Sequence, residues 1–170
     1  MLPYQGKMSI LRFQKPPIEA MQARLKYVEG LTFMGQGGSG HWTVLDAAHE
    51  GRPSGATGPM EMVLIALMGC SAMDVVSILQ KMRAPLTDLQ LEAQAERAET
   101  HPRVYTRIHL TYRVVGRGLK PEQVARAVQL SQEKYCSVSA MLRPTVPISY
   151  EVWIEDPETG QRQAVPLVKP

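Results

Sequence analysis

The stretch that decides the fold is GPMEMVLIALMGCSAMDVVSILQKM, residues 58–82, which is the longest apolar segment of the chain. Its start has the features of a helix N-terminus. Pro59 suits a first helical turn because it has no N–H to lose, and Glu61 follows where the helix dipole favours an anion. From Met62 to Leu79 nearly every side chain is apolar or small. A helix that is apolar on every face is buried, so we expect the rest of the chain to pack around this one.

The same stretch is about long enough to cross a bilayer, which takes roughly 20 residues. However, Gly69, Cys70, Ser71 and Asp74 interrupt its centre, and a carboxylate is costly in lipid. We therefore expect the core helix of a globular domain, with no membrane partner. A membrane span would instead make solubility depend on detergent.

Composition limits the classes of function. A chain of 170 residues is long enough for one domain with a real core. The net charge of +3 is slight and no basic block is present, so we expect no nucleic-acid partner. Two cysteines, at positions 70 and 136, are too few for a disulfide-stapled secreted scaffold, and no signal peptide opens the chain. These features predict a cytoplasmic protein with reduced thiols.

The four histidines show no spacing typical of metal ligands, either to one another or to the cysteines. We therefore expect no metal site and no cofactor. The histidines are His41, His49, His101 and His109.

Organisation along the chain predicts a single domain over residues 21–156. Residues 1–20 have little periodicity and are expected to form a flexible extension, and residues 157–170 an exposed tail. Between them, strands are predicted by alternation of apolar and polar residues, and helices by apolar residues at helical spacing. Residues 21–34, with a turn at 29–30, and residues 41–46 are expected to form a hairpin, followed by a loop over 47–58.

The second half repeats the strand pattern and then changes period. Residues 86–99 and 104–115 predict a long antiparallel hairpin. An amphipathic helix is expected over 119–135, a short helix over 137–142 and a last strand over 148–154. The order of elements indicates an α+β fold, with antiparallel sheets packed around the central helix. So few elements leave part of an all-apolar helix uncovered, which predicts a tight homodimer that completes the burial.

The two cysteines are the strongest nucleophile candidates. Cys70 falls in the middle of the apolar helix, and Cys136 falls at a helix boundary where the following backbone N–H groups would lower its pKa. The spacing of the two cysteines alone allows two interpretations. The pair is redox-active, with one thiol oxidised and the other resolving it as a disulfide, or both are inert core residues.

Several segments resemble the osmotically inducible / organic hydroperoxide resistance (OsmC/Ohr) superfamily. They are nearest to its YhfA-like branch and cover about residues 21–154. The two cysteine motifs occur in the family's order, the second as Cys136-Ser137-Val138-Ser139. The matching segments are MQARLKYVEGLTF at 21–33, PMEMVL at 59–64, GCSAMDVVSILQK at 69–81 and LSQEKYCSV at 130–138.

This resemblance implies an intertwined homodimer that reduces organic hydroperoxides through two cysteines. Cys70 looks like the peroxidatic residue and Cys136 the resolving one, and a dithiol reductant would restore the pair. The alternative is a non-catalytic, stress-associated dimer that keeps the fold and binds a small apolar ligand.

In the peroxidases of this superfamily a glutamate ten residues before the first cysteine holds an arginine that stabilises the thiolate. Here that position is Met60, and the carboxylate comes one residue later at Glu61. Nine residues separate Glu61 from Cys70, about half a turn beyond complete turns, so Glu61 is expected to point away. The peroxidases supply this arginine from the loop after the first strand, but residues 29–40 contain no arginine. The candidates to take its place are Arg24, Arg52 and Arg143.

Asp74 is a further supporting candidate. It follows Cys70 by four residues and so shares its helical face. A carboxylate there disfavours a second negative charge on the thiol. Asp74 either orients groups at the site or is a hydrogen-bonded structural residue.

Overall fold

The computed structural model of the protein describes residues 21–167 and divides into two compact units, one ending at Pro59 and the other starting at Met60. The extension predicted for residues 1–20 lies outside the described residues.

The N-terminal unit is a three-stranded antiparallel sheet, where the sequence predicted a two-stranded hairpin. Its strands are β1 (Ala23–Glu29), β2 (Thr32–Gly37) and β3 (Trp42–Leu45), in the order β1-β2-β3. The turn at Gly30, with φ +52°, reverses the chain, so the segment predicted to continue β1 pairs with it instead. A Cβ at Gly30 would lie 2.6 Å from His49 Nε2, so this turn has no room for a side chain.

The loop after β3 is organised by the buried carboxylate of Asp46. The Gly55 N–H donates to it at 2.8 Å, and Arg52 forms an ion pair with it at 3.0 Å. Thr32 also donates its hydroxyl to Asp46 at 3.1 Å. These partners, chiefly the Gly55 N–H, lower the pKa of Asp46.

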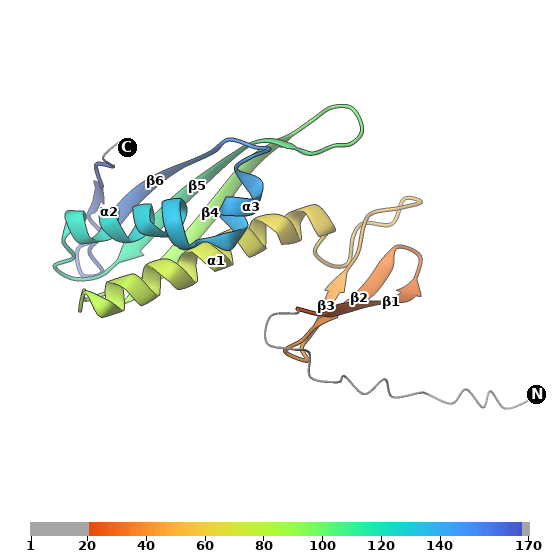
Figure 1. Ribbon diagram of the computed structural model, residues 1–170, viewed down its shortest axis with the longest axis horizontal. Coiled ribbons are helices and arrows are strands. Elements are labelled where there is room, and N and C mark those ends of the chain that lie inside the picture. Colours follow the sequence, from red (N-terminus) through yellow and green to blue (C-terminus); the bar gives the residue numbers. More distant parts are fainter. Residues whose placement is uncertain (1–20, 168–170) are drawn as a thin grey trace, which may run out of the picture. The chain divides into compact units, whose positions relative to one another are not determined.

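The C-terminal unit places three helices on one face of a four-stranded sheet with the order β4-β5-β6-β7 (Figure 1). The strands β5 and β6 are parallel, whereas the other two pairs are antiparallel. The prediction of wholly antiparallel sheets is therefore wrong at one pair. The connection from β5 to β6 contains two of the three helices, α2 and α3, and crosses over the sheet, as parallel pairing requires. The elements are α1 (Pro59–Lys81), β4 (Asp88–Arg97), β5 (Tyr105–Val115), α2 (Pro121–Leu130), a π-helix η1 (Ser131–Tyr135), α3 (Ser137–Leu142), β6 (Ile148–Glu155) and β7 (Arg162–Ala164).

Helix α1 confirms the predicted central helix, but only one of its faces is fully buried. That face repeats every four residues through Leu67, Ser71, Val75 and Leu79. Met73 is 75% exposed, so a single chain does not bury α1 on every face. Of the helices that the structure describes, α1 alone is long and apolar enough to cross a membrane, a property it shares with core helices of soluble proteins.

Two further differences from the sequence expectation have local causes. A bulge between Glu96 and Arg97 shifts the register of the β4–β5 hairpin, so Tyr105 is buried although strict alternation from the buried Ile108 would put it on the opposite face. The stretch expected to be an exposed tail contains β7, which pairs with β6, and Val165 beyond it is buried.

The core of this unit lies between the helices and the sheet. Its fully buried side chains come from α1, β5, α2 and β6, with Ile108, Leu110, Tyr112 and Val114 of β5 at the centre. The opposite face of the sheet is polar, and there Arg113 and Arg162 both donate to the Glu155 carboxylate.

The Glu155 cluster makes stability depend on acid. Hydrogen bonds from Arg113 and Arg162 lower the pKa of Glu155 from 4.5 to about 2. Because the pKa is lower in the folded chain, the stabilisation is present in full above pH 4.5 and is lost as the pH falls toward 2.

Urea unfolding at about pH 6 and about pH 3 should show a larger loss of stability for the wild type than for Glu155→Gln. Glu99→Gln, at an exposed position, is the control and should behave as the wild type. Equal acid sensitivity of Glu155→Gln and the wild type would contradict this assignment.

Candidate functional site

The two cysteines lie close together in the C-terminal unit. Cys70 is in the middle of α1 and Cys136 is the N-cap residue of α3. The two Sγ atoms and a carboxylate oxygen of Asp74 all lie within 4.8 Å of one another. Both thiols are free. Asp74 therefore shares the helical face of Cys70, as its spacing predicted, and all three are groups that can ligate a soft metal ion.

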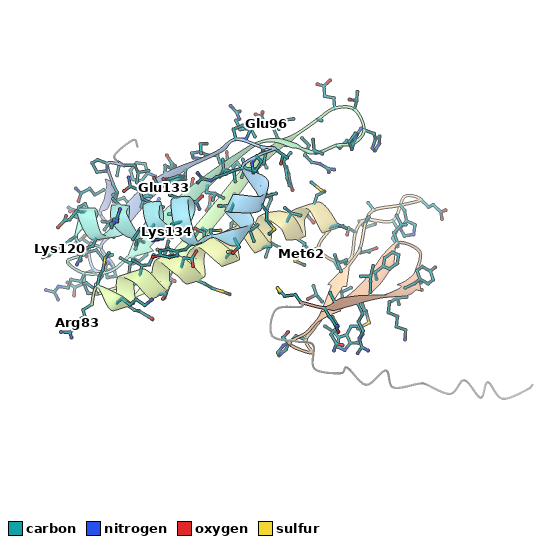
Figure 2. The ribbon with its side chains drawn as sticks, in the orientation of Figure 1. Met62, Arg83, Glu96, Lys120, Glu133 and Lys134 are labelled. Atoms are coloured by element: carbon teal, nitrogen blue, oxygen red, sulfur yellow. The ribbon has the colours of Figure 1, made fainter. Side chains whose placement is uncertain are left out.

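Cys136 is brought to this position by η1, the π-helical turn that follows α2. The Cys136 N–H donates to the Ser131 carbonyl at 2.8 Å, which closes this wider turn. Within η1, Ser131 and Gln132 are buried, whereas Glu133 and Lys134, both labelled in Figure 2, are exposed. Single π-turns are often found at functional sites.

The surroundings of Cys136 raise the pKa of its thiol, where the sequence predicted a lowered one. The expected backbone donor is present, since the Ser139 N–H lies 3.4 Å from Cys136 Sγ. Cys136 is only 3% exposed, however, and burial, which disfavours the charged thiolate, outweighs this hydrogen bond. Cys70 is half-buried and is the more accessible of the two residues.

A buried polar network lies beside the sulfurs and joins three parts of the unit. Ser71 Oγ of α1 lies 2.5 Å from Tyr112 Oη of β5 and 2.9 Å from Ser131 Oγ of η1. Ser131 also donates to the Asp74 carboxylate at 3.2 Å. The network thus reaches the thiol site through Asp74.

Gln132 completes this network with both ends of its amide. Its Nε2 donates to Tyr112 Oη at 2.6 Å and to Ser71 Oγ at 3.0 Å. Its Oε1 accepts from Ser139 Oγ at 3.0 Å and from the Arg143 guanidinium at 3.1 Å. One side chain therefore ties α3, which carries Cys136, to α1 and β5.

Burial raises the pKa of Tyr112 to about 12, so its hydroxyl stays protonated and serves as a hydrogen-bonding group. Across residues 21–167, every buried side-chain nitrogen or oxygen has a hydrogen-bond partner. A fully satisfied buried network holds its members in one arrangement.

Sequence reasoning missed this network, although the sequence contains a signal for it. Ser71 interrupts the apolar stripe of α1 between Leu67 and Val75. Gln132 follows Val128 by four residues and so continues the buried stripe of α2. A polar side chain on a buried stripe needs a partner, and two such residues on different helices indicate a shared network.

The other predicted site residues lie elsewhere. Glu61 is exposed at the start of α1, where its charge contributes to the raised pKa of Tyr105, after the larger effect of burial. Tyr105 donates its hydroxyl to the carbonyl of Met60 at 2.7 Å. Arg143, the remaining cation candidate of this unit, contacts the network through Gln132.

Arg24 and Arg52 belong to the N-terminal unit. Arg24 lies over the ring of Trp42, 5.1 Å from its centroid, and Arg52 forms the ion pair with Asp46 described above.

A pocket of ≈ 340 Å³ opens beside the thiol site, between α1 and the end of α2. Asp74 forms part of its wall. The rest of the lining is mainly apolar, with one lysine: Ser77, Ile78, Lys81, Met82, Leu130 and Tyr135.

Comparison with known proteins gives the family. The family model described as OsmC-like protein matches residues 51–151. Protein YhfA of Escherichia coli strain K12 is 54% identical over 134 residues, which cover 78% of this chain and 98% of YhfA. This chain belongs to the OsmC-like family. The resemblance inferred from the cysteine motifs is thereby confirmed.

Solved structures support the same fold for this OsmC-like protein. A hypothetical protein from Aquifex aeolicus VF5 has a TM-score of 0.69 at 32% identity, covering 81% of this chain and 99% of its own. The organic hydroperoxide resistance protein OhrB of Bacillus subtilis has a TM-score of 0.54 at 16% identity, covering 78% and 97%. The α+β arrangement of two sheets and a central helix is thus shared with OsmC and Ohr structures.

The network predicts a specific effect of replacing Gln132. Gln132→Met keeps most of the side-chain volume but removes the partners of Ser139, Arg143 and Tyr112. Leaving buried polar groups unpaired should lower the free energy of unfolding by about 1–3 kcal/mol. Urea unfolding measures this loss. The matched control is Gln80→Met on the exposed part of α1, which should change stability by less than about 0.5 kcal/mol. Equal effects of the two substitutions would show that the network does not contribute.

Proposed function

We propose that this OsmC-like protein reduces organic hydroperoxides by a two-cysteine mechanism. The observation that carries the proposal is the distance between the two sulfurs, which lie within 4.8 Å of each other although they come from different helices. A disulfide needs the sulfurs at about 2.05 Å, so side-chain rotation with a small shift of α3 would join them.

The roles of the two thiols follow from their burial. Cys70 is the more accessible residue and is proposed to attack the peroxide. Cys136 is almost fully buried and its pKa is raised. A thiol that resists ionisation is a poor first nucleophile, which suits Cys136 to the resolving step.

The proposed reaction has three steps. The Cys70 thiolate attacks the terminal oxygen of the hydroperoxide, the O–O bond breaks, and the alkoxide takes a proton and leaves as the alcohol. The resulting sulfenic acid at Cys70 condenses with the Cys136 thiol, forming a disulfide and releasing water. An external dithiol then reduces this disulfide by exchange and is itself oxidised.

The substrate class is suggested by the neighbouring pocket. Its mainly apolar lining suits the organic part of a hydroperoxide, and Asp74 connects the pocket to the two sulfurs. The name of the Bacillus subtilis relative, an organic hydroperoxide resistance protein, agrees with this class. A dithiol reductant implies a reducing compartment, and the cytoplasm is the location we propose.

The cysteine roles predict different outcomes for two variants. Cys70→Ser should consume no cumene hydroperoxide above the level of the double variant, because the attacking sulfur is gone. Cys136→Ser should complete one turnover and stop, with a sulfenic acid that dimedone traps at Cys70. The measurements are peroxide consumption and intact mass after one equivalent of hydroperoxide.

In the wild type the same treatment should remove both free thiols and form one disulfide between positions 70 and 136. Equal residual activity in the two single variants would overturn the role assignment. Slow and unselective loss of thiols would instead support the alternative function, a dimer that binds a small apolar ligand without catalysis.

We further propose that the protein is a homodimer. In the C-terminal unit, α1 leaves Ile65 and Met73 exposed, and in the N-terminal unit the sheet exposes Leu25, Tyr27 and Trp42. Apolar surface of this extent on a soluble protein is typical of an interface.

Light scattering should therefore give twice the 18.9 kDa mass of one chain. Met73→Glu places a charge on the exposed side of α1 and should shift the protein toward monomer, whereas Glu99→Gln should not. A wild-type monomer at micromolar concentration would contradict the dimer. Cosedimentation with lipid vesicles would assign the exposed face of α1 to a membrane instead.

A further inference from the structure

The thiol site contains a third group that the redox mechanism does not use, the carboxylate of Asp74. Its oxygen lies within 4.8 Å of both sulfurs. Among the ion pairs of the described residues none involves Asp74, and its carboxylate accepts a hydrogen bond from the Ser131 hydroxyl. Two sulfurs and a carboxylate oxygen are donor atoms of the kinds that zinc binds. This arrangement is favourable once a metal cation is present.

We propose that Cys70, Asp74 and Cys136 form a binding site for a borderline-soft divalent cation, Zn²⁺ above all. The expectation of no metal site considered the histidines and the cysteines and left Asp74 out. The proposal does not rest on hydroperoxide reduction, because it needs only the positions of the three groups.

The geometry is close to that of a zinc site with three protein ligands. Zinc binds sulfur at about 2.3 Å and carboxylate oxygen at about 2.0–2.2 Å with tetrahedral angles, so two ligand atoms lie about 3.6–3.8 Å apart. The three atoms here all lie within 4.8 Å of one another. Small side-chain rotations therefore suffice to bring them to one ion. The i, i+4 spacing of Cys70 and Asp74 places two ligands on one helical face, the arrangement that helical zinc motifs use.

The choice of metal follows from the ligands. Thiolates are soft ligands that favour zinc over magnesium or calcium, which prefer oxygen. Three protein ligands leave a fourth position for water or an external thiol. Asp74, one of the three proposed ligands, also lines the pocket between α1 and the end of α2.

Charge balance also favours binding at this partly buried place. With both thiols protonated and Asp74 ionised, the three side chains carry one negative charge. Binding of Zn²⁺ displaces the two thiol protons, and the ion with two thiolates and one carboxylate again carries one negative charge. The metal thus permits both thiolates to form without adding net charge to the site.

Neighbouring groups hold two of the ligands in place. Ser131 donates to Asp74 at 3.2 Å, and the Ser139 N–H points at Cys136 Sγ from 3.4 Å. Second-shell hydrogen bonds of this kind orient metal ligands, and their removal costs about 10–100-fold in affinity.

The test uses the reduced, full-length protein and Co²⁺ as a spectroscopic probe. We expect one Co²⁺ per chain, a sulfur-to-cobalt charge-transfer band in the near ultraviolet and intense tetrahedral d–d bands, all abolished by added Zn²⁺. Cys70→Ser and Cys136→Ser should each weaken the charge-transfer band and bind at least 100-fold more weakly. Asp74→Asn should keep the charge-transfer band but bind at least tenfold more weakly.

Controls separate this site from adventitious binding. Asp88→Asn, at an exposed carboxylate on β4, should bind as the wild type does, and Ser131→Ala should bind about 10–100-fold more weakly. Circular dichroism checks that each variant is folded. Absence of the charge-transfer band in the wild type, or equal affinity in the cysteine variants, would overturn the proposal.

The metal and redox proposals fail separately. Hydroperoxide consumption is measured with a chelator present, and Co²⁺ binding without peroxide. Consumption without metal binding overturns the metal site alone, and metal binding without consumption overturns the redox function alone. If both occur, one equivalent of Zn²⁺ should slow disulfide formation, because the ion and the peroxide compete for the same sulfurs.

Discussion

The structure of the C-terminal unit depends on the hydrogen bonds that Gln132 makes in its interior. An amide has two donors and an acceptor, and here it uses both ends to join α1, β5 and α3. Those are the elements on which the two sulfurs and the neighbouring hydroxyls are placed. Apolar packing alone would let the helices slide against the sheet at little cost, whereas a buried polar group that loses its partner is penalised. The relative position of the two sulfurs is thus fixed by polar contacts inside an otherwise apolar core.

The charge of the thiol site follows from the same arrangement. Burial disfavours a negative charge at Cys136, and the carboxyl group of Asp74 lies within 4.8 Å of both sulfurs. A chemistry that passes through a thiolate must therefore overcome this charge or bring in a cation. Hydroperoxide reduction and zinc binding meet this constraint in opposite ways. The first needs a thiolate only briefly at the more exposed cysteine, and the second neutralises both thiolates for as long as the ion stays.

Much of this architecture was predictable from the sequence, and the failures have specific physical causes. The helix of residues 58–82 was predicted almost to the residue, because Pro59 marks its start and its apolar run is long. The hairpin of β4 and β5 followed from alternation, except where a bulge moved Tyr105 to the buried face. The closeness of Cys70 and Cys136 came from family motifs, since no local pattern measures a distance between helices. The π-turn before Cys136 was missed because its sequence, SQEKY, continues a helical pattern. The prediction of a lowered pKa for Cys136 was wrong because burial raises it, and the burial of one residue depends on the whole fold.

The parallel pairing of β5 with β6 has a consequence for how the protein reaches this state. Antiparallel neighbours can zip together from a turn, but these strands must wait for the intervening α2, η1 and α3 to be laid across the sheet. Pairing between segments so distant along the chain is slow to form. Until this crossover is in place and the hydrogen bonds of Gln132 to β5 and α3 have formed, Cys136 is open to solvent. A nascent or refolding chain therefore presents its more sheltered thiol to oxidants before the crossover is complete, and newly made molecules are the ones most exposed to unwanted intermolecular cross-linking.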